Sequence, residues 1–288
     1  MPDPSLDRSM GALLGLAVGD ALGAPFEGRE RDSYPRVTDY SVGGVHGGGP
    51  GTWTDDTAMA MCLAESLLAR GALEERDLLE RFLRWYRHGE NSCAGAAVGV
   101  SQRTRAVLEI FERSDRVDAA IDVANEGNGC IMRLAPIAIF FRRSEAEARR
   151  WARRQARVTH TSEAALAATE ALAALLVVAL CTGDRATVLR ATSAHYRGKC
   201  RDQISSAPRA VDTLEAAIWC ISDSGTFEEA ITEAVNLGGD TDTLGAVTGQ
   251  LAGAIFGASA ISPRWLHGLH SRARLTEVAR RLHDMGTR

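Results

Sequence analysis

The sequence has little lysine, no closely spaced cysteines and few prolines after its first 50 residues. Lys199 is the only lysine among 33 basic residues, so arginine carries nearly all of the positive charge. The six cysteines include no CxxC pair, which excludes a zinc knuckle and a thioredoxin-type redox pair. Scattered thiols in a chain of ordinary size are typical of a reducing compartment, and we therefore expect a cytoplasmic protein.

The chain also lacks the features of nucleic-acid-binding and membrane proteins. Its formal net charge of −4 at pH 7 does not provide the positive field of a nucleic-acid-binding protein. The apolar run at 10–19 follows no positively charged segment, because Asp3 and Asp7 offset Arg8 and the amino terminus, so we reject a signal peptide. The uncharged run at 243–260 contains four glycines and several polar side chains, which favours a buried helix over a membrane span. We expect a monomer with no nucleic-acid or membrane partner.

Few prolines and many alanines favour an all-α fold. After Pro50 only three prolines remain, which permits long helices through most of the chain. Apolar residues recur with helical periodicity, and convincing strand-like alternation is absent from the sequence. No low-complexity linker or shift in composition marks a boundary, so we predict one compact helical domain over residues 1–288. The expected helices cover roughly 55–70, 74–88, 99–113, 145–157, 161–182, 209–222, 227–236 and 241–258.

Two expected helices carry glycine at every fourth position. Each glycine costs a helix about 1 kcal/mol relative to alanine, so a repeated stripe needs an offsetting gain, such as close approach of a neighbouring backbone. We therefore expect both helices at the centre of the bundle, where they could lie near each other. We also expect residues 161–181 there, because this segment is apolar almost all round. The stripes are Gly11, Gly15, Gly19 and Gly23 in the first helix and Gly245, Gly249, Gly253 and Gly257 in the second.

Two acidic segments each combine a glycine turn with threonines and aspartates before a long apolar helix: GTWTDDT at 51–57 and GGDTDT at 238–243. Helix capping is the simple explanation for either segment alone. One oxygen is enough to cap a helix, however, and surplus charge beside a buried helix costs several kcal/mol unless it is paired. Carboxylates with no lysine, cysteine or histidine among them suit hard cations. The pattern therefore favours Mg²⁺ or Mn²⁺ and allows two ions to share a carboxylate.

Two further segments contain candidate site residues. Residues 126–133, EGNGCIMR, precede an apolar stretch, and glycines before a helix can form a nest of N–H donors for a phosphate. A turn is the simpler explanation for a lone GNG sequence. In residues 19–28, GDALGAPFEG, Asp20 interrupts an apolar stripe and Glu27 lies in a loop with proline and glycine.

Five segments resemble, in this order, motifs of the ADP-ribosylglycohydrolase family. That family includes the dinitrogenase-reductase-activating glycohydrolases and the ADP-ribosyl-arginine and ADP-ribosyl-serine hydrolases. The similarity extends from about Gly11 to Leu266, and the pair TDDT and GGDTDT is highly specific. The segments are GDALGAPFEG, GTWTDDTAMAMCLAES, GNGCIMRLAP, VTHTSEAALAATEA and NLGGDTDTLGAVTGQLAGA.

The resemblance implies an all-α metal-dependent hydrolase that removes ADP-ribose from modified protein side chains with two Mg²⁺ or Mn²⁺ ions. Glu27 matches the acidic residue of a mobile loop over the substrate ribose, and His160 matches a histidine in the distal part of the cleft. Asp240 corresponds to a residue beside or between the ions. The matching metal ligands are Thr54, Asp55, Asp56, Asp242 and Thr243, and the loop that cradles the diphosphate matches Gly127, Asn128, Gly129 and Cys130.

Cleavage of a glycosidic bond agrees with this set of carboxylates. Two cations can hold the vicinal hydroxyls of the terminal ribose and orient a water towards its anomeric carbon. An oxocarbenium-like transition state gains from nearby carboxylates, and one of them can take the proton of the water. Asp56 and Asp240 are the candidates for this catalytic role, and Glu27 is the third.

Several alternatives stay open at this point. Residues 97–105 lack the aspartate often present in nitrogenase-linked members, which argues against that role. Arginine-linked ADP-ribose is the favoured substrate, followed by serine-linked ADP-ribose and O-acetyl-ADP-ribose. A non-catalytic relative or an ADP-ribose-binding protein is weaker, because every ligand position is filled. We assign no role to His46, and we interpret the arginine-rich segment 142–157 as a solvated helix face.

Overall fold

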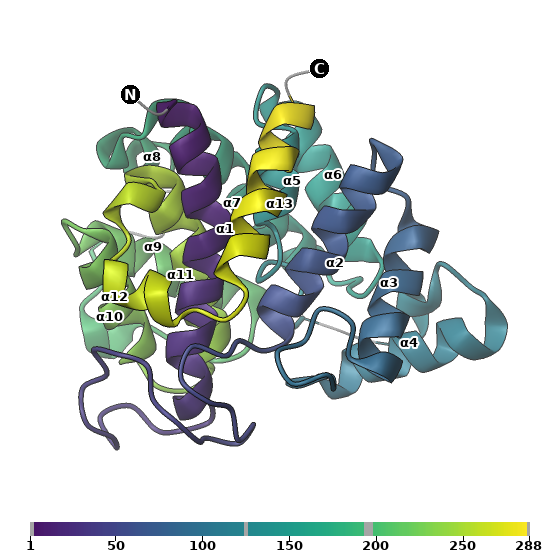
Figure 1. Cartoon of the computed structure of the whole chain (residues 1–288), viewed down its shortest axis with the longest axis horizontal. Coiled ribbons are helices and arrows are strands. Elements are labelled where there is room, and N and C mark those ends of the chain that lie inside the picture. Colours follow the sequence, from purple (N-terminus) through teal and green to yellow (C-terminus); the bar gives the residue numbers. More distant parts are fainter. Residues whose placement is uncertain (1–2, 124–125, 193–197, 287–288) are drawn as a thin grey trace.

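The structure, a computed structural model, describes residues 3–123, 126–192 and 198–286. Within these ranges it contains no β-strand, and its isolated bridges join Gly43 to Gly48 and Gly127 to Arg209, so the predicted all-α class is confirmed (Figure 1). The α-helices are α1 (Pro4–Gly23), α2 (Asp55–Arg70), α3 (Glu75–His88), α4 (Gln102–Ser114), α5 (Ala135–Phe140), α6 (Glu145–Arg157), α7 (Glu163–Thr182), α8 (Arg185–Ala191), α9 (Ala210–Ser222), α10 (Phe227–Val235), α11 (Thr241–Phe256), α12 (Pro263–Gly268) and α13 (Arg272–Met285). Short 3₁₀ helices are η1 (Ala24–Phe26), η2 (Ala119–Asp122), η4 (Arg201–Gln203) and η5 (Ala258–Ala260).

The helices expected from periodicity match α2, α3, α4, α6, α7, α9, α10 and α11, with ends that differ by at most a few residues. The largest difference is at α4, which begins at Gln102 instead of residue 99. The expected ranges did not include α5, α8, α12 or α13. The first three of these are short, and α12 begins with Pro263, which occupies the first turn of a helix without loss of a hydrogen bond.

The two glycine-striped helices, α1 and α11, pack directly against each other. A Cβ atom built on Gly19 would lie 1.9 Å from the carbonyl oxygen of Gly245, and one built on Gly245 would lie 2.3 Å from that of Gly19. Such distances leave no room for any side chain, so the helix backbones are in contact. Gly15 faces Gly249 and Gly11 faces Gly253 in the same way, which makes the pair antiparallel and confirms the predicted central position.

Gly257 is a correction to the predicted stripe. We expected it to be the last glycine of the second helix, but α11 ends at Phe256. Gly257 is the residue after the helix, with φ of +83°, a backbone conformation that residues other than glycine rarely adopt. A glycine at this position therefore allows the helix to end here.

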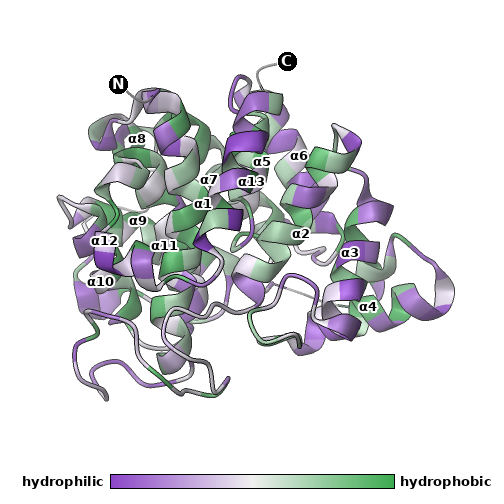
Figure 2. Ribbon diagram, viewed as in Figure 1, coloured by the Kyte–Doolittle hydropathy of each residue, from purple (hydrophilic) through white to green (hydrophobic). Residues whose placement is uncertain are grey.

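The interior of the bundle contains the most apolar helices (Figure 2). Among the described residues, two segments are long and apolar enough to cross a membrane by length and composition, Pro4–Phe26 and Glu163–Thr182. Of their apolar windows, 83% and 67% are buried inside the protein, as expected for core helices. The central position predicted for residues 161–181 agrees with the burial of α7.

The segments that contain the predicted site residues lie at one end of the α1–α11 pair. The C-terminal end of α1 meets the start of α11, where Thr241 Oγ1 donates a hydrogen bond of 2.8 Å to the Gly23 carbonyl. The helix α2 begins beside them, because Asp20 of α1 binds its first turn. The long connection from α1 to α2 crosses the same end of the bundle (Figure 1).

Candidate functional site

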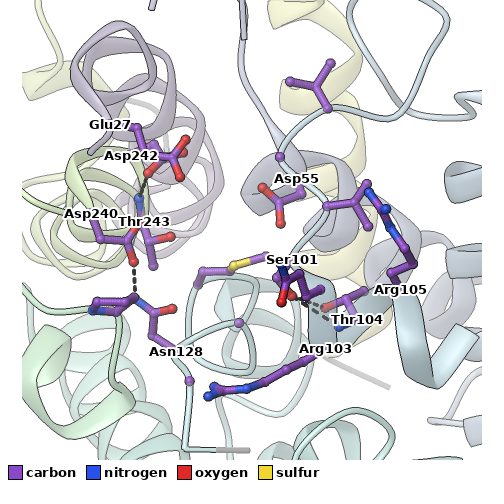
Figure 3. A pocket seen from close by; sticks show the side chains of 18 of the residues that line it. Glu27, Asp55, Ser101, Arg103, Thr104, Arg105, Asn128, Asp240, Asp242 and Thr243 are labelled. Atoms are coloured by element: carbon purple, nitrogen blue, oxygen red, sulfur yellow. Dashed lines mark hydrogen bonds between the residues drawn. The ribbon is translucent and has the colours of Figure 1, made fainter. Parts of the chain in front are cut away.

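A cleft of about 840 Å³ opens at this end of the bundle (Figure 3). One wall, the acidic wall, carries Glu27 from the α1–α2 connection and Asp240 and Asp242 from the start of α11. The other carries residues 97–105, with Asp55 from the start of α2 packed against Gly99 on this side, and the loop at 127–129 lies between the two walls. Of the residues that the sequence predicted for the site, the cleft brings together Glu27, Asp55, Gly127, Asn128, Gly129, His160, Asp240, Asp242 and Thr243.

Asp20 of α1 holds the first acidic segment in place through hydrogen bonds. It is fully buried, and its two carboxylate oxygens accept four hydrogen bonds from the backbone N–H and hydroxyl groups of Thr54 and Thr57, at 2.6 to 3.0 Å. Thr54, at the position before α2, provides no cap through its own side chain. Asp20 therefore satisfies the start of α2, and Asp55 and Asp56 are not needed as caps.

Burial raises the pKa of Asp20 to about 6, although its four hydrogen bonds act in the opposite direction. In the sequence, Asp20 stands out only as an acidic residue within an apolar stripe, and no role was predicted for it. The sequence does not indicate the partners of Asp20, because Thr54 lies 34 residues further along the chain.

The second acidic segment is also more than a helix cap. Asp240 precedes α11 but makes no side-chain cap bond. Its Oδ2 atom instead accepts a hydrogen bond of 2.6 Å from Asn128 Nδ2, which also donates to Thr213 Oγ1 at 2.9 Å. Asp242 Oδ1 accepts from the N–H of Thr243 at 2.9 Å. The loop at 127–129 is thereby tied to the start of α11.

The two acidic segments meet at Thr54. Its hydroxyl oxygen lies 3.3 Å from Asp56 Oδ2 and 3.4 Å from Asp242 Oδ2. Thr54 and Asp56 are 4% and 1% exposed, and neither lines the cleft, so they lie behind Asp55 and Asp242. Asp56 differs in this respect from the other two candidate catalytic residues, Asp240 and Glu27, which do line it.

Burial raises the pKa values of Asp55, Asp56 and Asp242 well above the usual range, and neighbouring carboxylates raise them further. Within the described part of the chain, no arginine or lysine forms an ion pair with these three residues. Asp56 Oδ1 is buried and has no hydrogen-bond partner there. Buried oxygens that lack a partner and a counter-charge suit a divalent cation, so the residues present fit the cations that the motifs implied.

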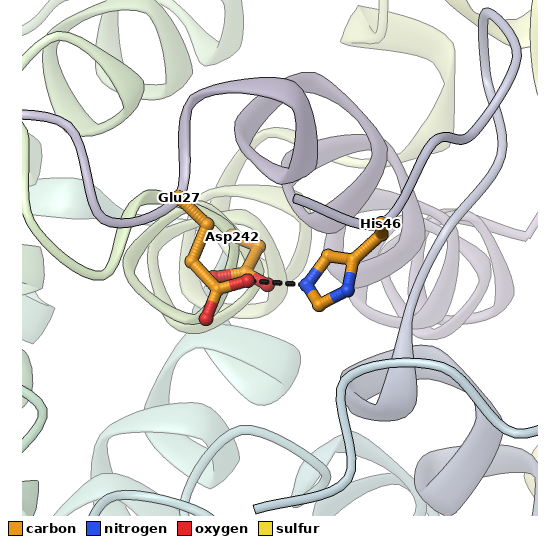
Figure 4. Close-up of side chains that lie close together, drawn as sticks. All are labelled: Glu27, His46 and Asp242. Carbon is orange, nitrogen blue, oxygen red and sulfur yellow. Dashed lines mark hydrogen bonds and ion pairs between the residues drawn. The ribbon is translucent and has the colours of Figure 1, made fainter. Parts of the chain in front are cut away.

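Glu27, His46 and Asp242 line the cleft and lie close together as a cluster (Figure 4). Their potential ligand atoms lie within 4.8 Å of one another, and His46 Nε2 forms an ion pair with Glu27. The hydrogen bond to Glu27 raises the pKa of His46. No role was predicted for His46, because a single histidine in a glycine-rich stretch carries no spacing signal.

The loop at 127–130 lies partly in the cleft. Gly129 packs so closely on His160 that a Cβ atom would lie 3.3 Å from His160 Cε1. Cys130 is fully buried and does not line the cleft, and its Sγ lies 3.3 Å from Thr169 Oγ1. The predicted part of Cys130 in substrate binding is therefore limited to its backbone.

Arg103 and Arg105 line the cleft on the side of residues 97–105, and Arg105 lies across from Glu27 and Asp242 but on the same side as Asp55 (Figure 3). Both side chains are exposed, at the start of α4. The sequence analysis used residues 97–105 only for the aspartate that they lack, and it did not predict the two arginines as site residues. The cleft thus combines carboxylates with two arginines, an arrangement that suits a ligand with both hydroxyl and phosphate groups.

Known proteins match this chain over nearly its whole length. The model of the family described as ADP-ribosylglycohydrolase matches residues 1–288. The ADP-ribosylarginine hydrolase Tri1 of Pseudomonas putida is 39% identical over 98% of this chain and 80% of its own length. The ADP-ribosyl-[dinitrogen reductase] glycohydrolase of Rhodospirillum rubrum is 33% identical, over 93% of this chain and 92% of its own.

A solved structure supports the same assignment. It is described as an ADP-ribosylglycohydrolase-related protein complex and matches with a TM-score of 0.84 and 40% identity, over 98% of this chain and 99% of that one. The resemblance of the motifs and the predicted class of enzyme are therefore confirmed: the chain belongs to the ADP-ribosylglycohydrolase family.

Proposed function

We propose that this protein hydrolyses the bond between ADP-ribose and an arginine side chain of a modified protein. Two relatives named ADP-ribosylarginine hydrolase, from Pseudomonas putida and Serratia proteamaculans, are 39% and 37% identical to it and support this linkage. The observation that carries the proposal is the cleft itself, which brings buried carboxylates from the starts of α2 and α11 into one cavity with two arginines.

The proposed cofactor is a pair of divalent cations, Mg²⁺ or Mn²⁺. The unpartnered Asp56 Oδ1 and the uncompensated charge of Asp55, Asp56 and Asp242 support it. When bound, the cations supply positive charge that balances the carboxylates and polarises the oxygens of a water and of ribose hydroxyls. The residues that would hold them are Thr54, Asp55, Asp56, Asp240, Asp242 and Thr243.

Asp240 is the better candidate for the general base. It lines the cleft, and Asn128 fixes one of its oxygens, whereas Asp56 lies behind the lining. Asp240 accepts the proton of the attacking water, and Glu27 faces the terminal ribose from the mouth of the cleft. The loop at 127–129 and Arg103 bind the diphosphate on the basic side.

The location and partners follow from the same proposal. The substrate is an ADP-ribosylated protein, and the product that remains in the cleft is ADP-ribose. All six cysteines are free, which agrees with the cytoplasmic location that we propose.

The test is release of free ADP-ribose from two peptides, one modified on arginine and one on serine, with Mg²⁺, Mn²⁺ or EDTA. We expect cation-dependent release from the arginine peptide and its loss in Asp55→Asn. The matched control is Asp223→Asn, which removes an exposed carboxylate at the end of α9 and should retain activity.

Two outcomes would contradict the proposal. Release from the serine peptide alone would assign the other linkage. Binding of ADP-ribose without release from either peptide would identify a binding protein.

A further inference from the structure

A second cavity adjoins the cleft at Glu27. It has a volume of about 770 Å³, and its lining comes from η1, from Arg29 and from the glycine-rich turn at 41–50. Glu27 lines both this cavity and the cleft, so the two meet at its side chain. The residues assigned above to the cations, the water and the diphosphate leave the second cavity without a role.

The walls of the second cavity are held in place by contacts within the protein. The Phe26 ring stacks on that of Tyr34, with ring centres 4.9 Å apart and planes at 25°. On the other side, the turn at 41–50 packs against Pro25, because a Cβ atom on Gly44 would lie 2.6 Å from Pro25 Cα. The apolar surface of this cavity is therefore present without a ligand.

Two valines of the turn line this cavity with exposed side chains. Val42 and Val45 are each 71% exposed, and in the described part of the chain Ile121, at 61%, is the one other large apolar residue of this kind. A single exposed apolar side chain is ordinary, but two on one short turn beside a cleft indicate a contact surface. The same turn reaches the cleft through His46, which contacts Glu27 (Figure 4).

Arg29 adds a positive charge to the second cavity. It is exposed, and among the described residues its side chain forms no ion pair. Its backbone is anchored, because its N–H donates to the Phe26 carbonyl at 3.1 Å and its carbonyl accepts from the Gly239 N–H at 2.8 Å. The guanidinium is therefore available to a carboxylate of a bound molecule.

The proposed reaction indicates which molecule this is. The terminal ribose lies at the carboxylates, and the diphosphate lies at the loop at 127–129 and Arg103. The modified side chain is attached to the anomeric carbon of that ribose, so the protein substrate extends away from the diphosphate. Glu27 faces the terminal ribose and also lines the second cavity, which places this cavity where the polypeptide leaves the cleft.

We propose that the second cavity binds the segment of the substrate protein that flanks the modified arginine. An apolar side chain of that segment packs against Val42 and Val45, and a carboxylate pairs with Arg29. This proposal rests on the proposed function and deepens it, because it gives the preferred substrate as a modified arginine between apolar and acidic residues.

The test compares three compounds. The acidic peptide has leucine and glutamate on both sides of an ADP-ribosylated arginine, the basic peptide has lysines in place of the glutamates, and free ADP-ribosylarginine has no flanking residues. The kcat/KM of each is measured with Mg²⁺. For the unaltered protein we expect the acidic peptide to exceed both other compounds by about fivefold or more.

The double variant Val42→Ser, Val45→Ser tests the apolar contact. We expect the ratio of kcat/KM for the acidic peptide to that for free ADP-ribosylarginine to fall about five- to twentyfold. Both side chains are exposed, so the fold should not depend on them. The matched control is Ile121→Ser, which removes an exposed apolar residue that lines neither cavity and should keep the ratio. An unchanged ratio in the double variant would overturn the proposal.

Arg29→Glu tests the ion pair by reversing the charge. We expect this variant to favour the basic peptide over the acidic one, whereas the unaltered protein favours the acidic one. The same preference in both proteins would overturn the role of Arg29.

Failure of the proposed function would be visible separately. If the unaltered protein releases ADP-ribose from none of the three compounds, the proposed function fails, and calorimetric titration of the same compounds tests the cavity. The acidic peptide should then bind more tightly than free ADP-ribosylarginine, and the valine variant should remove the difference. Equal affinities in the unaltered protein would overturn the docking proposal as well.

Discussion

At the scale of single residues, Asp20 is a member of α1 whose hydrogen-bond partners all belong to the start of α2, 34 and 37 residues further along. Because it satisfies that helix start, the two aspartates that follow Thr54 keep their oxygens for other partners. Its own carboxylate is fully buried and is held by four hydrogen bonds.

We expect Asp20→Asn to lower the free energy of unfolding by about 2 kcal/mol, because an amide can replace only part of the acceptor set. The same substitution should weaken Mn²⁺ binding, since Thr54 loses its support. Thermal unfolding and calorimetric titration with Mn²⁺ measure the two effects. Unaltered stability and unaltered affinity would contradict this account of Asp20.

Asn128 is the second residue with a testable positioning effect. We expect Asn128→Ala to lower kcat by about ten- to a hundredfold, because Asp240 loses the hydrogen bond that orients it. Thr213→Val removes only the other partner of Asn128 and should have a smaller effect. Steady-state kinetics on the arginine peptide compare the variants, and equal kcat values for both would count against this role.

The sequence was informative where a site residue belongs to a compact motif. Asp55 and Asp242 each lie within a short run of acidic and hydroxyl residues, so their chemistry could be predicted. Asp20, His46 and Arg105 could not be identified in this way, because each acts through neighbours that only the folded chain brings near.

At the scale of helices, the contact between α1 and α11 depends on glycine at each crossing position. We expect Gly19→Ala to lower the free energy of unfolding by about 3 kcal/mol or more, because the added methyl group would lie 1.9 Å from the Gly245 carbonyl oxygen. Chemical denaturation measures this change.

Gly49→Ala is the matched control, because a Cβ atom at Gly49 would have no neighbour within 4 Å. Its expected effect is within about 0.5 kcal/mol. If Gly19→Ala lowers the free energy of unfolding by no more than the control does, the two helices can separate at this position without cost.

The helices themselves were largely predictable, and the reasons for the failures are local. Long apolar periodic segments such as α7 stand out in a sequence, whereas α8 has only seven residues. In α13 the buried residues Leu275, Val278, Ala279 and Leu282 do show helical spacing, but many arginines surround them. The pairing of α1 with α11 was suggested by glycine spacing, and its antiparallel register was not.

At the scale of the whole molecule, the buried carboxylates make stability depend on pH and on cations. Because the folded-state pKa values of Asp20 and Asp56 are raised, the cation-free folded protein binds more protons than the unfolded chain. These groups therefore contribute less stability as pH rises through their folded pKa values. For Asp20, a rise in pKa from 3.8 to about 6 corresponds to about 3 kcal/mol.

We expect Asp56→Asn to be more stable than the unaltered protein in EDTA at neutral pH, by about 2 kcal/mol, because it removes a buried charge. The difference should shrink as pH falls and Asp56 becomes protonated. Exposed ion pairs, such as Arg201 with Asp32, act in both proteins and cancel in the comparison. Added Mg²⁺ should reverse the order, because the variant has lost a ligand.

Thermal unfolding over a pH series, with EDTA or with Mg²⁺, measures this difference. A variant that is less stable than the unaltered protein in EDTA at every pH would show that Asp56 is stabilised by partners within the protein.

The pairing of α1 with α11 also sets an order of events during synthesis. Gly23 and Thr241, which join the two helices at the site, are 218 residues apart. At about 5–20 residues per second, a ribosome needs roughly 10 to 40 s to travel between them. Throughout that interval the glycine face of α1 has no partner, and half of the acidic wall does not yet exist. The cleft is therefore completed late in translation. The newly made chain can assemble all of the residues proposed to hold cations only after α11 has left the ribosome.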